Sequence, residues 1–330
     1  MTRTAPVRIV RDSLLLGPVR VTFQRTLRIP ETGLHPLPPG LGRFPLRRVE
    51  DYPDTAPAEW LARGGIMLPI YQREAMWLSF DSDQPTALQV GVGKVCAVSG
   101  LPWIERLIGD PQNYVALPRQ PWLDGINAGE GFIRQFVAVP LGSGATVEGQ
   151  VTGEETHGGV QLRAVRLTAE ALEKWRAEQA AAEESTDVED CYDGPLMCAP
   201  PAADGAMGLG AGGRMRQEVY ADSRPLTDYD ETGALRVFVH LCSAAQWTAI
   251  TGEVPPPTPV DRDAYVEAGL PWFDYYDADA RDLAASEVLS RVKSVGEKLD
   301  IDDDPFVPVK PGTVIPIGGA SADTVSDGTW

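Results

Sequence analysis

Apolar and polar residues alternate along several stretches of the chain, which is the period of β-strands that bury one face. Residues 19–29 (VRVTFQRTLRI) alternate with a single break at Arg25, and residues 160–167 (VQLRAVRL) alternate until Val165. Residues 132–140 (FIRQFVAVP) and 235–241 (LRVFVHL) are richer in β-branched and aromatic residues. The pattern therefore predicts strands at these places, with 132–140 mostly buried.

The centre of the chain, residues 114–166, sets strand-like runs between glycine-rich turns. After 132–140, Gly142 and Gly144 supply the positive φ that a tight reversal requires, and residues 146–151 (TVEGQV) are predicted to form the next strand. This region is therefore predicted to be a meander with a hairpin in its middle. Its apolar face requires a covering layer.

Few stretches carry helix signals. Residues 168–184 (TAEALEKWRAEQAAAEE) begin with an N-cap threonine, and shorter helices are predicted over 243–251 and 284–299. Before Leu167 there are about eight strand candidates and very little helix, a profile typical of sandwiches and open barrels. The predicted fold class is α+β, predominantly β: an antiparallel sandwich or open barrel with a few covering helices.

Changes in composition divide the chain into segments. Residues 185–213 are dense in Asp, Pro, Gly and Ala, which predicts a linker or a long loop. We expect a β-rich domain with a closing helix over 1–184 and a smaller α+β portion packed on it over 214–307. The remaining residues, 308–330, are expected to form an extended or disordered tail.

The net charge and the cysteines narrow the class of protein. The 330 residues include 47 acidic and 29 basic side chains, a formal charge of −18 that disfavours nucleic acids and anionic membranes as partners. No run approaches the ~20 apolar residues of a membrane span, so membrane insertion is not expected. The start (MTRTAPVRIVRD) lacks the apolar segment of a secretion signal, which favours a cytoplasmic location and reduced thiols for the four cysteines.

Motifs for catalysis or cofactor binding are weak in this sequence. Residues 208–213 (GLGAGG) fit the GxGxxG pattern, but a strand-like run follows them where a dinucleotide site needs a helix, so a flexible loop is predicted. His35, His157 and His240 lack the spacing that places two metal ligands on one helix face. We therefore assign no catalytic residue, no cofactor and no metal site from these motifs.

Three acidic residues flank the predicted hairpin: Glu148, Glu154 and Glu155. Two of them could cleave a glycosidic bond by acid–base chemistry if they faced each other across a cleft. The alternative is that all three are exposed acids in turns.

Four phrases of the sequence carry a resemblance to a known family. They are residues 71–77 (YQREAMW), 120–125 (QPWLDG), 131–136 (GFIRQF) and 269–276 (GLPWFDYY). Together they resemble an uncharacterised family of bacterial proteins with fungal relatives, over about residues 25–295. The resemblance implies a β-rich body and supplies no activity and no catalytic residue to transfer.

Three classes of function are consistent with these observations. The favoured hypothesis is a non-enzymatic scaffold that assembles into a homo-oligomer, because both ends carry proline-rich arms, aromatic residues cluster and catalytic signatures are absent. A stress-associated role is a further expectation with no residue behind it. The alternatives are a module that binds a carbohydrate or another small molecule, and a hydrolase with a carboxylate or metal site involving Glu148 and His157. The candidates for an interface or for stacking on a ligand are Trp122, Phe132, Trp272, Phe273, Tyr275 and Tyr276.

Overall fold

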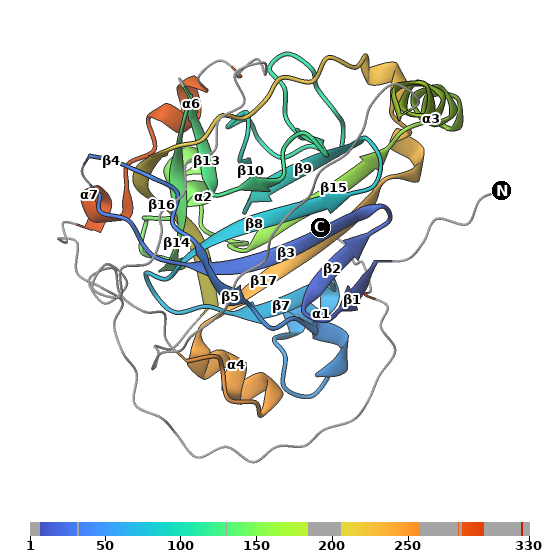
Figure 1. Cartoon of the computed structure of the whole chain (residues 1–330). Coiled ribbons are helices and arrows are strands. Elements are labelled where there is room, and N and C mark those ends of the chain that lie inside the picture. Colours follow the sequence, from blue (N-terminus) through green and yellow to red (C-terminus); the bar gives the residue numbers. More distant parts are fainter. Residues whose placement is uncertain are drawn as a thin grey trace.

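The structure of the protein is a computed structural model that describes residues 7–31, 33–129, 131–183, 206–257, 283, 286–299 and 325. Strands make up most of the regular structure and helices lie at its periphery (Figure 1). The prediction of an α+β, predominantly β fold is therefore confirmed. Within the described residues, no helix is long and apolar enough to cross a bilayer.

The strands are β1 (Arg8–Val10), β2 (Ser13–Leu16), β3 (Val19–Thr26), β4 (Leu34–His35), β5 (Gly40–Arg43), β6 (Arg47–Arg48), β7 (Ile66–Pro69), β8 (Ala75–Ser82), β9 (Thr86–Val92), β10 (Val95–Cys96), β11 (Val115–Leu117), β12 (Trp122–Leu123), β13 (Gly125–Gly129), β14 (Phe132–Pro140), β15 (Val160–Arg166), β16 (Ala206–Arg216) and β17 (Leu235–Cys242). The α-helices are α1 (Ala58–Arg63), α2 (Val147–Thr152), α3 (Ala169–Glu183), α4 (Ala244–Thr251), α6 (Glu287–Ser290) and α7 (Val295–Leu299). Short 3-10 helices cover Val49–Asp51, Leu226–Asp228 and Glu231–Gly233.

The strand pairings form one series that starts and ends near β8. β8 pairs with β14, β14 with β16, β16 with β17, β17 with β15 and β15 with β9, all antiparallel. β9 then pairs with β11, and β12, which follows β11 in the chain, pairs with β8. β4 and β7 are added in parallel to β16 and β17. The main apolar core draws on these strands and includes Phe23, Leu78, Val90, Phe136, Leu162 and Val237.

The break in the alternation of β3 has a structural cause. Arg25 is buried, and its Nε lies 2.6 Å from Oε1 of Glu74, whose side chain is fully buried. The other carboxylate oxygen of Glu74 accepts a hydrogen bond from the Tyr71 amide at 2.9 Å. Burial raises the pKa of Glu74, while Arg25 and the Tyr71 amide favour its ionised form. The charged residue in the apolar face therefore forms a buried ion pair between β3 and the start of β8.

Glycines in β16 allow its neighbours to approach closely. Residues 206–213 were assigned to the linker from sequence, but they form the first part of β16, which pairs along β14 and continues the sheet. A Cβ atom on Gly210 would lie 2.6 Å from a methyl group of Val295, and one on Gly212 would lie 2.6 Å from a methyl group of Val137. The GxGxxG pattern is therefore part of a closely packed strand. The rest of the predicted linker, up to residue 205, lies outside the described residues.

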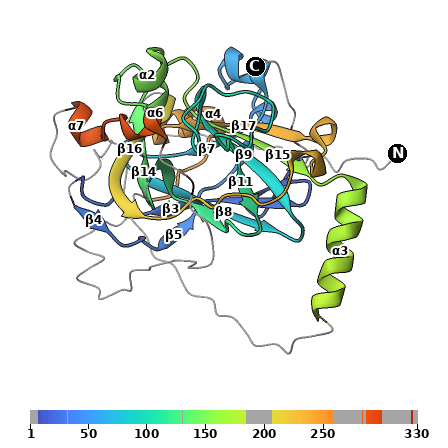
Figure 2. The ribbon, with the colours of Figure 1, turned by 90° about the horizontal axis from the view of Figure 1, so that it is seen from above.

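The helix predictions differ in outcome. The helix after Thr168 is confirmed: the Thr168 hydroxyl accepts from the Ala171 amide at 3.2 Å, and α3 extends away from the body of the protein (Figure 2). The helix capped by Ser243 is confirmed as α4. Residues 284–299 were predicted as one helix, but the described residues form α6 and α7. Ser294 and Glu297 cap each other's amides at 3.1 and 2.7 Å, which starts a new helix.

Buried polar side chains in the phrase at 120–125 hold a distant segment in place. The Gln120 amide group donates to the Glu218 carbonyl at 3.2 Å and accepts from the Tyr220 amide at 3.1 Å. Asp124 donates its backbone amide to the Gln217 side chain at 3.0 Å and accepts from that side chain at 2.8 Å. Desolvation raises the pKa of Asp124 to about 7. These contacts take the place of strand pairing between the two segments.

Candidate functional site

The segment between β14 and β15 is a helix and a loop where the sequence predicted a strand of a hairpin. The Thr146 hydroxyl accepts from the Gly149 amide at 2.9 Å, and Gly153 ends the helix with a φ of 80°. The hairpin prediction is therefore wrong, because the threonine and the glycine are the two caps of α2. Helix α2 lies with α6 and α7 beside β14 and β16 (Figures 1 and 2).

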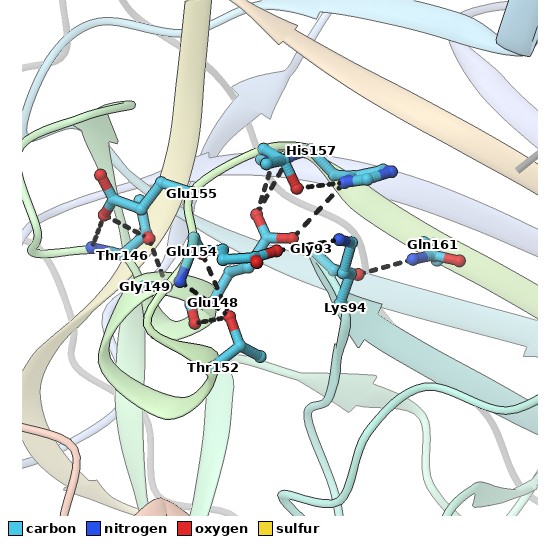
Figure 3. Close-up of polar contacts among 12 residues, drawn as sticks. Gly93, Lys94, Thr146, Glu148, Gly149, Thr152, Glu154, Glu155, His157 and Gln161 are labelled. Atoms are coloured by element: carbon cyan, nitrogen blue, oxygen red, sulfur yellow. Dashed lines mark hydrogen bonds and ion pairs between the residues drawn. The ribbon is translucent and has the colours of Figure 1, made fainter.

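Glu148 projects from α2 into the loop that follows it and is only 1% exposed. Its Oε2 accepts from the consecutive backbone amides of His157 and Gly158, at 3.2 and 3.0 Å (Figure 3). Gly93 packs directly against this carboxylate, since a Cβ atom there would lie 2.5 Å from Cδ of Glu148. The carboxylate thus fixes the loop to the helix.

Glu155 makes the reciprocal contact from the loop to the helix. Its oxygens accept from the Thr146 amide at 3.0 Å, the Gly144 amide at 3.1 Å and the Thr146 hydroxyl. Burial opposes ionisation of Glu155, but these hydrogen bonds outweigh it and lower the pKa. Gly149 leaves room for the side chain, because a Cβ atom there would lie 2.5 Å from Cγ of Glu155. We call Glu148 and Glu155 together the carboxylate clamp.

His157 is presented on the clamped loop, with its side chain 20% exposed. Its Nδ1 lies 2.7 Å from the Thr156 hydroxyl and 3.7 Å from Oε1 of Glu148 (Figure 3). Oε1 of Glu148 is buried and has no hydrogen-bond partner among the described residues. One oxygen of Glu148 therefore holds the backbone of the loop, and the other faces the imidazole that the loop carries.

The imidazole of His157 is neutral at physiological pH. Burial, and to a smaller extent the positive charges of Arg63 and Lys94, lower its pKa to about 4, while the charge of Glu154 opposes them. The contact with Glu148 is therefore one between a carboxylate and a neutral ring, although its geometry would suit an ion pair. A carboxylate on the Nδ1 side favours the tautomer with the proton on Nδ1, which leaves a lone pair on Nε2.

Two cations lie near His157. Lys94 forms a solvent-exposed pair with Glu154, with Nζ 3.5 Å from Oε2. The guanidinium of Arg63, at the end of α1, lies over the ring of Phe238 at 5.0 Å. Within the described part of the chain, Arg63 has no hydrogen bond or ion pair from its side chain. Burial lowers the pKa of Arg63, and the charges of Glu59 and Glu148 counteract this effect.

The structure separates the three glutamates that the sequence grouped. Glu148 meets His157, Glu155 has its oxygens engaged in the clamp, and Glu154 lies 65% exposed beside Lys94. They therefore have different roles and do not form the acid–base pair that glycosidic cleavage would need.

The other two histidines have different surroundings, and the ring of His240 lies 4.6 Å from the ring of Phe238, over which the guanidinium of Arg63 lies. His240 is buried, its Nε2 lies 2.9 Å from the Gly64 carbonyl, and its ring stacks on Trp60 at 4.5 Å. Burial lowers its pKa to about 3. His35 is in β4. Among the described residues, no three His, Cys, Asp or Glu side chains are grouped so that they could hold a metal ion. Cys96 and Cys242 are buried free thiols.

Trp122 and Phe132, the two aromatic candidates within the described residues, make their ring contacts with other residues than those of this site. Trp122 is half-buried in β12 and meets Trp77 edge to face at 6.4 Å, and Phe132 lies beneath the guanidinium of Arg214 at 4.6 Å. The other four, Trp272, Phe273, Tyr275 and Tyr276, lie outside the described residues.

Glu148 and His157 were predicted as candidates from the sequence, whereas Arg63 was not. The position of Arg63 depends on Gly65, which follows the helix with a φ of 91° and whose Cβ would lie 2.2 Å from the Phe238 carbonyl. This close approach sets the end of α1 against β17. The glycine pair after Arg63 is a turn signal, but it does not reveal which strand the turn will meet.

Replacing Glu155 with alanine is expected to lower the free energy of unfolding by about 1 kcal/mol, because the amides of Gly144 and Thr146 lose a partly buried acceptor. Glu154→Ala is the matched control, since it removes the same charge from an exposed neighbour. Urea unfolding of both variants measures the difference. Equal stabilities would show that the clamp does not hold the loop.

Comparison of the chain with models of protein families, with curated proteins and with solved structures gives no significant match.

Proposed function

We propose that the protein is a hydrolase in which His157 is the general base and Glu148 positions it. The observation that supports this proposal is the buried Oε1 of Glu148, which lacks any other partner among the described residues and lies 3.7 Å from Nδ1 of His157. A carboxylate behind an imidazole is the arrangement by which hydrolases orient a histidine base and stabilise its protonated form.

The proposed reaction uses water as the nucleophile. Nε2 of His157 takes a proton from the water while the water oxygen forms a bond to the electrophilic centre of an ester. The positive charge that develops on the imidazole is stabilised by Glu148, which lies in a buried position where electrostatic interactions are strong. The bond to the leaving oxygen then breaks, and His157 returns the proton to it.

The clamp gives the base a fixed place. Glu148 holds the backbone of His157 and Gly158, while Glu155 fixes the start of the helix that carries Glu148. A base held by bonds at its backbone and its ring loses little freedom on reaction, which favours a productive geometry.

The test is a screen of chromogenic carboxylic and phosphate esters with the full-length protein at neutral pH. The proposal expects turnover of at least one ester class by the wild type and none above background by His157→Gln. A folded wild-type protein that hydrolyses no ester in the screen, or a variant as active as the wild type, would refute it.

We also propose, as a second function, that the chain assembles with copies of itself. What supports it is the edge of the sheet at β1, which among the described strands pairs only with β2. The carbonyl of Val7, just before it, accepts from the Val325 amide at 2.8 Å, so a residue of the C-terminal arm lies next to the N-terminal strand. An edge strand has backbone groups that a second chain can pair with.

Light scattering on a sizing column measures this directly. Self-assembly predicts a native mass that is a multiple of 35.6 kDa. A monomer at micromolar concentration would exclude it.

The carbohydrate-binding alternative stays a prediction. Trp122 is the tryptophan candidate for stacking on a sugar that lies within the described residues.

A further inference from the structure

We propose that Arg63 binds an anionic group of the substrate, and that the substrate is a phosphate ester. The assignment of a substrate rests on the proposed hydrolase function, whereas the binding of a tetrahedral oxyanion at Arg63 can be measured without any turnover.

The position of Arg63 follows from packing. Its guanidinium lies over the ring of Phe238, and that ring touches the loop of His157, since a Cβ atom on Gly159 would lie 2.8 Å from Cε1 of Phe238. Gly159 follows directly on Gly158, whose amide Glu148 binds. Arg63, Phe238, the loop and the imidazole are therefore contiguous, although they come from α1, β17 and the loop before β15.

The guanidinium of Arg63 has hydrogen-bond donors available for an anionic ligand. It is half-buried and has no carboxylate bonded to it among the described residues, whereas Arg25, Arg47 and Arg163 each contact a carboxylate at 2.6 to 2.8 Å. A guanidinium that is partly desolvated and stacked on an aromatic ring retains donors for the oxygens of an anion. Such an anion would bond directly to Arg63, on which Glu59 and Glu148 act only through their charges.

The local charge at the site favours a phosphate. The whole chain carries a formal charge of −18, yet Arg63 and Lys94 both act on His157 as positive charges. The pair of Lys94 with Glu154 is exposed and weak, so Lys94 is available to a second anionic oxygen. Glu148 and Glu154 also act at this site, but two cations can each contact an oxygen of a phosphate group, which has more charged oxygens than one carboxylate.

The chemistry balances without another reactant. Water forms a bond to phosphorus as its proton passes to Nε2 of His157, the bond from phosphorus to the ester oxygen breaks, and His157 returns the proton to that oxygen. Arg63 stays bound to the phosphate oxygens throughout.

The experiment is a calorimetric titration of the full-length protein with inorganic phosphate, together with proton NMR of its three histidines. Arg63→Met keeps the side-chain stem over Phe238 and removes the charge. Arg20→Met is the matched control, because Arg20 pairs with Asp81 on the outer face of β3 and also loses one positive charge.

Phosphate is expected to bind the wild type and Arg20→Met equally and Arg63→Met at least about tenfold more weakly. It is also expected to raise the pKa of His157 in the wild type and in Arg20→Met but not in Arg63→Met, because a bound anion favours the imidazolium. Equal binding by Arg63→Met, or no binding by the wild type, would overturn the inference.

These outcomes separate the inference from the proposed function. Binding through Arg63 without hydrolysis of any ester would remove the hydrolase and leave the anion site. Hydrolysis of an ester by the wild type, together with phosphate binding that is equal in the wild type and Arg63→Met, would leave the hydrolase and remove the anion site.

Discussion

Glu74→Ala is expected to lower the free energy of unfolding by about 3–5 kcal/mol, because removing one partner of a buried ion pair leaves the other charge uncompensated. The side chains of Arg25 and Glu74 are 8% and 0% exposed. The change also leaves the Tyr71 amide without its acceptor. Phe44, over which the Arg25 guanidinium lies at 5.7 Å, cannot replace the carboxylate. Urea unfolding followed by circular dichroism measures the loss.

The same two strands provide a control. Arg20 and Asp81 pair across β3 and β8 on the outer face, at 3.7 Å with side chains 46% and 79% exposed. Asp81→Ala is expected to change the unfolding free energy by less than about 1 kcal/mol, because solvent screens an exposed pair. Replacing both buried partners, as Arg25→Met with Glu74→Leu, should recover much of the lost stability. If Glu74→Ala and Asp81→Ala were equally mild, the buried pair would not have the role described above.

His157→Gln is expected to reduce kcat by about 10²–10⁴-fold on whichever ester the wild type hydrolyses, which is the usual contribution of a general base. Glutamine keeps the backbone amide that Glu148 binds, so the free energy of unfolding should not change. His35→Gln, in β4, serves as the control for loss of a histidine and should keep full activity. A similar loss of kcat in both variants would remove His157 from the mechanism.

The strands were predictable where one face of the sheet is buried. Alternation located β3 and β15, because burial of every second residue imposes a period of two on the sequence, and β-branched and aromatic residues located β14 and β17. The exception, Arg25, could not be interpreted from sequence, since its partner lies 49 residues away on another strand. Likewise, Gln120 and Asp124 are buried because of contacts with residues near 217.

The glycine-rich parts were not predictable, because the same residues serve several structures. Around residues 142–153, glycine and threonine suit both a hairpin turn and the caps of a helix, and the hydrogen bonds of Glu155 to Thr146 decide for the helix. In β16 the glycines reflect close neighbours, a tertiary cause that local composition cannot show.

Of the three residues to which the proposals assign a role, two could be named from the sequence by residue type. Glu148 and His157 are nine residues apart, a spacing with no meaning until α2 and its loop are known. Arg63 joins them only through the packing of α1 on β17. The residue types could suggest the chemistry, but only the fold shows that these residues lie close together.

The pH dependence of kcat/KM is the measurement that tests the role of His157 most directly, on an ester that does not itself titrate between pH 3 and 8. A base whose pKa is lowered to about 4 stays unprotonated until the pH falls to that value. The value of kcat/KM is therefore expected to be level from about pH 8 to 5.5 and to fall below about pH 4. Circular dichroism at each pH is the control that the protein is still folded. An acidic limb near the ordinary histidine pKa of about 6.5, or an unchanged profile in His157→Gln, would contradict this expectation.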